Sequence, residues 1–167
     1  IPAKKPLLSD LIDSVEAYVK LHNKPLPIYN IEVKSSAATD NKYHPEPKPY
    51  VKMIMDVVEE KKLGKRAYLQ SFDFRILKRL HQDYPDVSSA VLVGNSEKRS
   101  LDEQLKDLGY TPDIYSPHYS MVSKSLLEEC HDRKMKLIPW TVNDKPAIDS
   151  LIALGVDCTI TDYANMF

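Results

Sequence analysis

Hydrophobic positions follow two alternating periods along the chain. Apolar residues between Leu8 and Val19 recur at helical spacing, whereas residues 28–34 alternate as a strand does and are rich in β-branched side chains. The same succession continues to the C-terminus. The pattern predicts helices over residues 7–22, 50–63, 74–80, 101–108, 122–133 and 146–154, and strands over 28–34, 67–70, 89–93, 113–115, 136–141 and 157–161.

Strands that alternate with helices are typical of an α/β fold, with a parallel sheet and helices packed outside it. The first strand has one polar face, made by Asn30, Glu32 and Lys34, and an opposite face that holds Ile31 and Val33. A doubly wound sheet would bury both faces. A (β/α)₈ TIM barrel explains the polar face, because its active site lies at the carboxyl ends of its strands. Six strands cannot close that barrel, so we expect an incomplete one.

Composition narrows the possible functions. The chain has 167 residues, 43% hydrophobic and 28% charged, as in a soluble globular domain. The 23 basic residues nearly cancel the 24 acidic ones, and a net charge of −1 disfavours nucleic-acid and anionic-membrane partners. The 4 glycines form no Gly-rich phosphate loop, and no apolar run is long enough to span a membrane. Cys130 and Cys158 lack metal-ligand spacing and are expected to be buried thiols.

The segment Asn30–Lys34 is the strongest local signal for chemistry. It places the carboxylate of Glu32 and the ammonium of Lys34 on one strand face, towards the carboxyl end. A hard divalent cation prefers carboxylate oxygen, and a neighbouring lysine can hold a phosphate oxygen. The alternative is a structural Glu–Lys pair, either in a polar layer of the barrel or on a solvated face.

Other strand ends also carry polar or aromatic groups. Trp140, the single tryptophan, ends a strand and could supply an apolar wall with one N–H donor, although core packing is the more common explanation of a lone tryptophan. The segments 70–72, 116–118 and 161–162 lie where a barrel carries its catalytic loops. His118 is the best placed of the five histidines, because it follows a strand.

These segments together resemble the glycerophosphodiester phosphodiesterase family. The resemblance covers nearly the whole chain and rests on four pieces in the family's order: Asn30–Lys34, Gln70–Phe72, Ser116–Tyr119 leading to Trp140–Asn143, and Gly155–Asp162. It implies a (β/α)₈ barrel enzyme that hydrolyses small-molecule glycerophosphodiesters, such as glycerophosphocholine or glycerophosphoethanolamine, to glycerol 3-phosphate and an alcohol.

The resemblance also implies roles for single residues. Glu32 is similar to a ligand of a divalent metal, Ca²⁺ or Mg²⁺. The expected substrate-binding residues are Lys34, Gln70, Phe72, His118 and Trp140, with Lys34 on the phosphate and the two aromatic side chains as walls of the glycerol pocket.

The family's His-Arg-Gly, Glu-x-Asp and catalytic His-Asp segments have no counterpart in the sequence, whose one His-Asp pair, His131–Asp132, falls in a predicted helix. We therefore expect residues 1–167 to be the C-terminal part of a single barrel domain, with about six βα units. The first two strands and the catalytic histidines would precede Ile1, and the chain alone would be inactive.

Two other functions fit the same residues. One is a non-catalytic binding or structural protein on a partial barrel, in which Glu32 and Lys34 form a polar core pair. The other is a different TIM-barrel phosphohydrolase. The sequence favours no oligomeric state or compartment; a periplasmic or secreted location would require an export signal ahead of Ile1.

Overall fold

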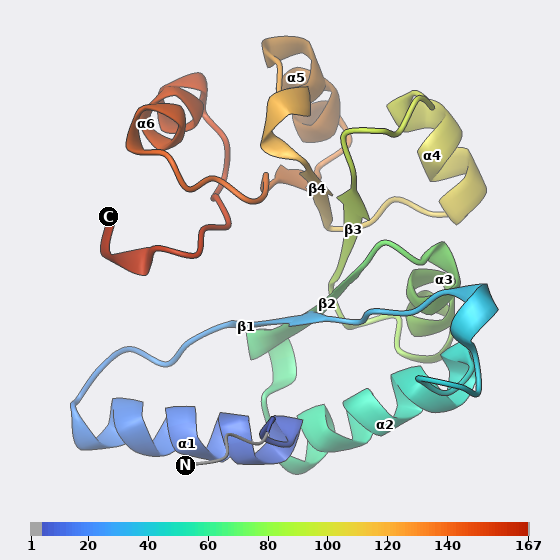
Figure 1. Cartoon of the computed structure of the whole chain (residues 1–167), viewed down its shortest axis with the longest axis vertical. Coiled ribbons are helices and arrows are strands. Elements are labelled where there is room, and N and C mark those ends of the chain that lie inside the picture. The colour runs from blue at the N-terminus through green and yellow to red at the C-terminus, as the bar shows by residue number, and fades with distance from the viewer. Residues whose placement is uncertain (1–4, 167) are drawn as a thin grey trace.

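The computed structural model describes residues 5–166 and contains one parallel sheet with helices between its strands (Figure 1). The helices are α1 (Leu8–Leu21), α2 (Pro47–Glu60), α3 (Phe74–Asp83), α4 (Leu101–Leu108), α5 (Lys124–Asp132) and α6 (Lys145–Leu154). The strands are β1 (Tyr29–Glu32), β2 (Ala67–Ser71), β3 (Ser89–Val93), β4 (Ile114–Pro117) and β5 (Lys136–Leu137). Short 3₁₀ turns cover Ala37–Thr39, Gly64–Arg66, Tyr119–Met121 and Ala164–Met166.

The strands pair in chain order, β1-β2-β3-β4-β5, and every pair is parallel. The predicted α/β class is confirmed, and each predicted helix forms within a few residues of its expected bounds. Local signals explain the bounds. Pro47 starts α2 because its fixed φ suits the first helical turn. Ser100 and Glu103 form a capping box on α4, and Gly109 ends that helix at a φ of 85°.

The main core lies between the sheet and its helices. One cluster joins α1, α2 and α3 to the first two strands and includes Ile12, Val33 and Leu69. A second cluster joins α4 and α5 to the later strands and includes Tyr115 and Leu137. The alternation of β1 predicted one apolar face, and that face packs against the helices. Val33 is buried there, whereas Glu32 lies on the opposite side.

The other face of the sheet forms the inner side of the curved structure. The register aligns Glu32 with Gln70, Gln70 with Ala90, and Ala90 with Ile114, so these residues share one face. A small apolar cluster of Ala90, Ile114 and Ile138 occupies the middle of this face. Glu32 and Gln70 lie towards the carboxyl end of this face, where strands of a barrel carry their chemistry.

The prediction of a regular sixth strand over residues 157–161 is wrong. Residues 156–161 do run beside β5: the Asp157 N–H donates to Leu137 at 3.1 Å, and the Ile160 N–H donates to the carbonyl of Pro139 at 2.9 Å. The structure assigns no strand there, and β5 itself ends at Leu137 instead of 141. Pro117 explains the early end, because a proline has no N–H to donate to β5; pairing resumes where the Trp140 N–H donates to the Pro117 carbonyl at 3.0 Å.

The two cysteines differ. Cys130 is buried on α5, and burial raises the pKa of its thiol to about 12. The expectation that Cys158 is also buried is wrong, since it lies exposed on the segment beside β5.

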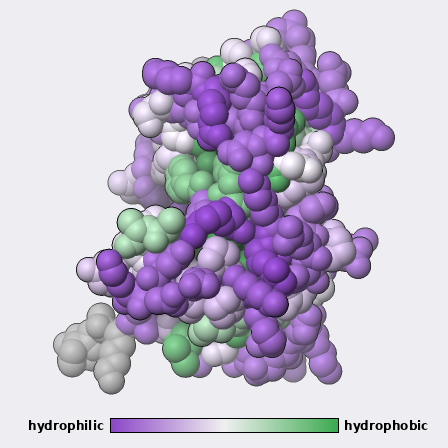
Figure 2. Space-filling view, turned by 90° about the vertical axis from the view of Figure 1, so that its right-hand side faces the viewer, coloured by the Kyte–Doolittle hydropathy of each residue, from purple (hydrophilic) through white to green (hydrophobic). Residues whose placement is uncertain are grey.

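The surface reflects the charged composition. The face shown in Figure 2 is mostly hydrophilic, with hydrophobic residues gathered near its middle. Within residues 5–166, no helix has the length and apolar character that crossing a membrane requires.

Candidate active site

A pocket of about 210 Å³ opens at the carboxyl ends of the strands. Five of the six residues expected to act on a metal or substrate line it: Glu32, Lys34, Gln70, Phe72 and Trp140. They come from the ends of three strands that are far apart in the sequence. The parallel register brings them together, because it places all carboxyl ends at one edge of the sheet.

Glu32 and Lys34 form a hydrogen-bonded ion pair at one side of the pocket. The Lys34 side chain is 79% exposed and that of Glu32 is 28% exposed. An ion pair in contact with water contributes only about 0–1 kcal/mol, so a bound anion can compete for the ammonium at little cost. Lys34 also retains two further N–H groups, which can donate to a ligand oxygen.

Gln70 gives the pocket an unpaired hydrogen-bond acceptor. The residue is only 8% exposed, yet Oε1 has no hydrogen-bond partner among the described residues. Leaving a buried acceptor unpaired costs about 1–3 kcal/mol, and native structures rarely retain one without a reason. A ligand hydroxyl or amine in the pocket would satisfy it.

Trp140 forms an apolar wall whose N–H is already used. Its Nε1 donates to the carbonyl oxygen of Ser116 at 2.8 Å. The rings of Phe72 and His118 each meet the indole edge to face, with centroids 5.4 Å apart and planes at 90°. This geometry is favourable for aromatic pairs. The indole therefore offers a ligand its carbon surface, and not the donor that the sequence suggested.

His118 lies beside Trp140 and does not line the pocket. Its Nδ1 is 2.8 Å from the Ser120 Oγ, and it accepts the Ser120 N–H at 3.3 Å, which caps the turn after β4. The structure thus places five predicted residues around one cavity and the sixth behind its aromatic wall.

Sequence reasoning did not single out Leu92, Thr141 and Ile160, which complete the lining. Leu92 shares the strand face of Gln70, because it lies two residues beyond the partner of Gln70 in the register, Ala90. That alternation was visible in the sequence, but only the register shows which face of β3 is the inner one.

An ionic cluster fixes the loop that follows Lys34. Arg75 binds Asp40 and Asp73, each at 2.7 Å, and the Ser35 Oγ donates to Asp73 at 2.8 Å. The hydrogen bond from Arg75 lowers the pKa of Asp40. Burial tends to raise the pKa of Asp73, but bonds from Arg75 and Ser35 outweigh it and lower the pKa. Both carboxylates are therefore anions at neutral pH and hold the loop against the start of α3.

The described residues do not form a metal site by themselves. Within residues 5–166 there is no group of three or more His, Cys, Asp or Glu side chains that could hold a metal ion. Glu32 is the single carboxylate in the pocket lining. One carboxylate is too few, because Ca²⁺ takes six to eight oxygen ligands and Mg²⁺ takes six.

Solved structures share this architecture, which defines the chain as an α/β protein of the barrel class. A structure from Silicibacter pomeroyi DSS-3 superposes with a TM-score of 0.79 at 24% identity, covering 96% of this chain and 54% of that one. The Oleispira antarctica phosphodiesterase OLEI02445, solved with its product sn-glycerol-3-phosphate, gives a TM-score of 0.71 at 18% identity over 95% of this chain and 57% of its own.

The sequence identifies the family. Residues 4–166 match the model of the glycerophosphoryl diester phosphodiesterase family, and the chain belongs to that family. The YhdW protein of Bacillus subtilis (strain 168), whose name places it in the same group, is 22% identical over 154 residues, which cover 92% of this chain and 60% of YhdW. The resemblance inferred from the sequence is thereby confirmed. The chain spans little more than half the length of these relatives.

Proposed function

We propose that the protein containing this chain hydrolyses glycerophosphodiesters to glycerol 3-phosphate and an alcohol, and that the chain supplies the substrate-binding side of the site. Water adds its oxygen to the phosphorus, the bond from phosphorus to the alcohol oxygen breaks, and the alcohol leaves with a proton. The observation that carries this proposal is the single pocket lined by Lys34, Gln70, Phe72 and Trp140 in a member of this family.

The proposed roles follow from the chemistry of each side chain. The Lys34 ammonium donates to an anionic phosphoryl oxygen, since it is exposed and only weakly paired. The unpaired Oε1 of Gln70 accepts a hydrogen bond from a glycerol hydroxyl. Phe72 and Trp140 pack against the carbon chain and limit the entry of water.

The acid–base groups and most metal ligands would come from outside these residues. We assign Glu32 as one ligand of a divalent cation, Ca²⁺ or Mg²⁺, which needs further ligands beyond those in the described chain. The catalytic histidines, with two further βα units, are expected ahead of Ile1.

Release of glycerol 3-phosphate from glycerophosphodiesters tests the proposal. We expect the full-length protein to release glycerol 3-phosphate in the presence of Ca²⁺ or Mg²⁺, and we expect this release to stop when the metal is chelated. We expect the 167-residue chain alone to release none. Turnover by that chain would show that the assigned roles are wrong.

Substitution of Glu32 separates an enzyme from a scaffold. In a metal-dependent enzyme, Glu32→Gln abolishes turnover and changes the metal dependence while the unfolding midpoint stays nearly constant. In a structural protein with a polar Glu32–Lys34 pair, the same substitution changes mainly stability, by about 0–1 kcal/mol because the pair is in contact with water.

A further inference from the structure

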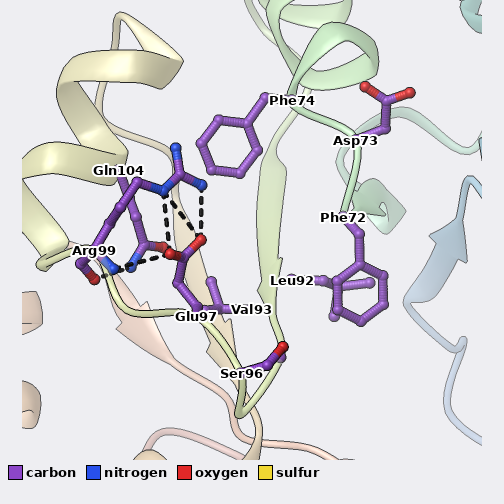
Figure 3. Close-up of a pocket in the computed structure, with 10 residues that line it drawn as sticks. Phe72, Asp73, Phe74, Leu92, Val93, Ser96, Glu97, Arg99 and Gln104 are labelled. Atoms are coloured by element: carbon purple, nitrogen blue, oxygen red, sulfur yellow. Dashed lines mark hydrogen bonds and ion pairs between the residues drawn. The ribbon is translucent and has the colours of Figure 1, made fainter. Parts of the chain in front are cut away.

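A second and larger pocket lies beside the candidate site, between the loops that follow β2 and β3 (Figure 3). Its volume is about 590 Å³. Phe72 and Leu92 line both pockets, so the two cavities share one wall. A ligand bound through Lys34 in the first pocket could therefore extend past Phe72 into the second.

The two pockets differ in charge. The first contains the exposed ammonium of Lys34, whereas the second is lined by Asp73, whose carboxylate is bound by Arg75 and Ser35, and by the Glu97–Arg99 ion pair. Arg99 is held by two carboxylates, because Nε and Nη2 donate to Glu97 and Nη1 donates to Asp107 at 2.8 Å. Among its described lining residues, the second pocket thus offers a phosphate no cation as exposed as Lys34, whose side chain is 79% exposed against 43% for Arg99.

Aromatic rings supply the apolar part of this pocket. Phe72 is 49% exposed, so part of its ring is accessible to a ligand. Phe74 lies with its ring beneath the Arg99 guanidinium, 5.5 Å from its centroid. In the view of Figure 3, Phe72 lies across the pocket from the Glu97–Arg99 pair. Aromatic surface of this kind suits an uncharged or cationic group.

Hydrogen bonds already hold the polar residues of this pocket, Glu97, Arg99 and Gln104, in place without a ligand. Glu97 accepts the backbone N–H groups of Lys98 and Arg99, each at 2.9 Å. Gln104 Nε2 donates to the Arg99 carbonyl at 3.0 Å, and the hydroxyl of Tyr115 donates to Gln104 Oε1 at 3.2 Å. A pocket held in this way loses little conformational freedom when it binds.

We propose that this second pocket binds the alcohol moiety of the diester, and that it accepts uncharged or cationic alcohols in preference to anionic ones. This inference rests on the proposed function. A phosphodiester carries both of its organic groups on one phosphorus. With the phosphate held at Lys34 and the glycerol in the smaller pocket, the alcohol reaches the neighbouring cavity across Phe72 and Leu92.

Filling the pocket at Gly94 tests the proposal. Gly94 lines the cavity, its φ is not in the left-handed region, and an added Cβ would find Ser96 Oγ, at 4.0 Å, as its nearest neighbour. Gly94→Leu therefore occupies space without backbone strain. Asn95→Leu is the matched control, because it adds the same side chain one residue away on an exposed position outside the lining.

The readout is kcat/KM of the full-length protein for two substrates, glycerophosphoethanolamine and the methyl ester of glycerol 3-phosphate. Gly94→Leu should lower kcat/KM for the ethanolamine diester by about tenfold, the effect of overpacking a bound group. It should change kcat/KM for the methyl ester, and the Kd for glycerol 3-phosphate, by no more than about twofold. Asn95→Leu should change none of the three.

An equal loss for both substrates, no loss for either, or weaker binding of glycerol 3-phosphate would overturn the proposal. If the wild type binds these compounds without hydrolysing them, the proposed function fails. The pocket is then judged by the Kd of glycerophosphoethanolamine, which must rise in Gly94→Leu and not in Asn95→Leu.

A comparison of two substrates tests the charge preference of the second pocket. Glycerophosphoserine differs from glycerophosphoethanolamine by one carboxylate, and the wild type should process it about fivefold less efficiently, because that carboxylate meets the negative face of Phe72 and no cation that is free of carboxylate partners among the described lining residues. Equal efficiency would overturn this part of the proposal.

Discussion

The indole N–H of Trp140 donates a 2.8 Å hydrogen bond to the carbonyl oxygen of Ser116, and so ties the segment that follows β5 to β4. The same indole forms the aromatic wall of the candidate site. One side chain therefore joins two segments of the sheet edge and shapes the pocket.

Replacing this side chain by Trp140→Phe should lower the free energy of unfolding by about 1–3 kcal/mol, because the Ser116 carbonyl loses its partner at a partly buried position. Urea unfolding followed by circular dichroism measures the change, since the variant has no tryptophan to report by fluorescence. Tyr43→Phe, which removes a hydroxyl from an exposed ring, is the control and should have almost no effect. Equal stability of wild type and Trp140→Phe would contradict a structural role for the N–H.

Lys34→Met should weaken binding of glycerol 3-phosphate by the full-length protein about tenfold to a hundredfold, the contribution of a charge-assisted hydrogen bond. Isothermal titration calorimetry at low salt measures the Kd. Lys52→Met is a matched control, since Lys52 is also an exposed lysine paired with a carboxylate, Asp56, but lies on α2 away from the pocket. Similar losses in both variants would indicate a general effect of net charge.

Two buried glutamines should respond oppositely to the same substitution. Gln104 is fully paired through Tyr115 and the Arg99 carbonyl, so Gln104→Leu should destabilise the fold by about 1–3 kcal/mol. Gln70→Leu removes an acceptor that has no partner among the described residues, and should leave stability equal or higher.

In the full-length protein, Gln70→Leu should nevertheless weaken binding of glycerol 3-phosphate. It should also reduce the preference for this ligand over propyl phosphate, which lacks the hydroxyls. Thermal unfolding and the two Kd values separate these effects. A large loss of stability in Gln70→Leu, with an unchanged ligand preference, would show that Gln70 is structural.

Glu97 makes stability depend on pH. Hydrogen bonds from Arg99 and from backbone N–H groups lower its pKa from the ordinary 4.5 to about 2. A depressed carboxyl pKa contributes stability that is present above pH 4.5 and is lost as the pH falls towards 2.

Glu97→Gln should therefore lower Tm at pH 7, and its difference from the wild type should shrink between pH 4.5 and pH 2. Solvent screening reduces the contribution of Glu97 to stability, because the Glu97–Arg99 pair is partly exposed. Glu59→Gln, at an exposed position on α2, is the control and should show no such pH dependence. A Tm difference that stays constant down to pH 2 would contradict the shifted pKa.

Local sequence determined the secondary elements and the two faces of β1. Helix periodicity, Pro47, the Ser100 capping box and Gly109 act over a few residues, so they can be recognised without knowledge of the fold. Five of the proposed site residues were also recognisable, because they stand at strand ends and match a family pattern.

Tertiary structure decided how those residues are used. The N–H of Trp140 is taken by Ser116, His118 lies behind the indole, and Gln70 Oε1 stays unpaired. The segment beside β5 keeps strand-like hydrogen bonds without becoming a strand. Each of these outcomes depends on partners distant along the chain, which are brought together by the parallel register and the packing of the loops. Periodicity and propensity describe only near neighbours, and for that reason they predicted the elements and not the pairing of polar atoms among them.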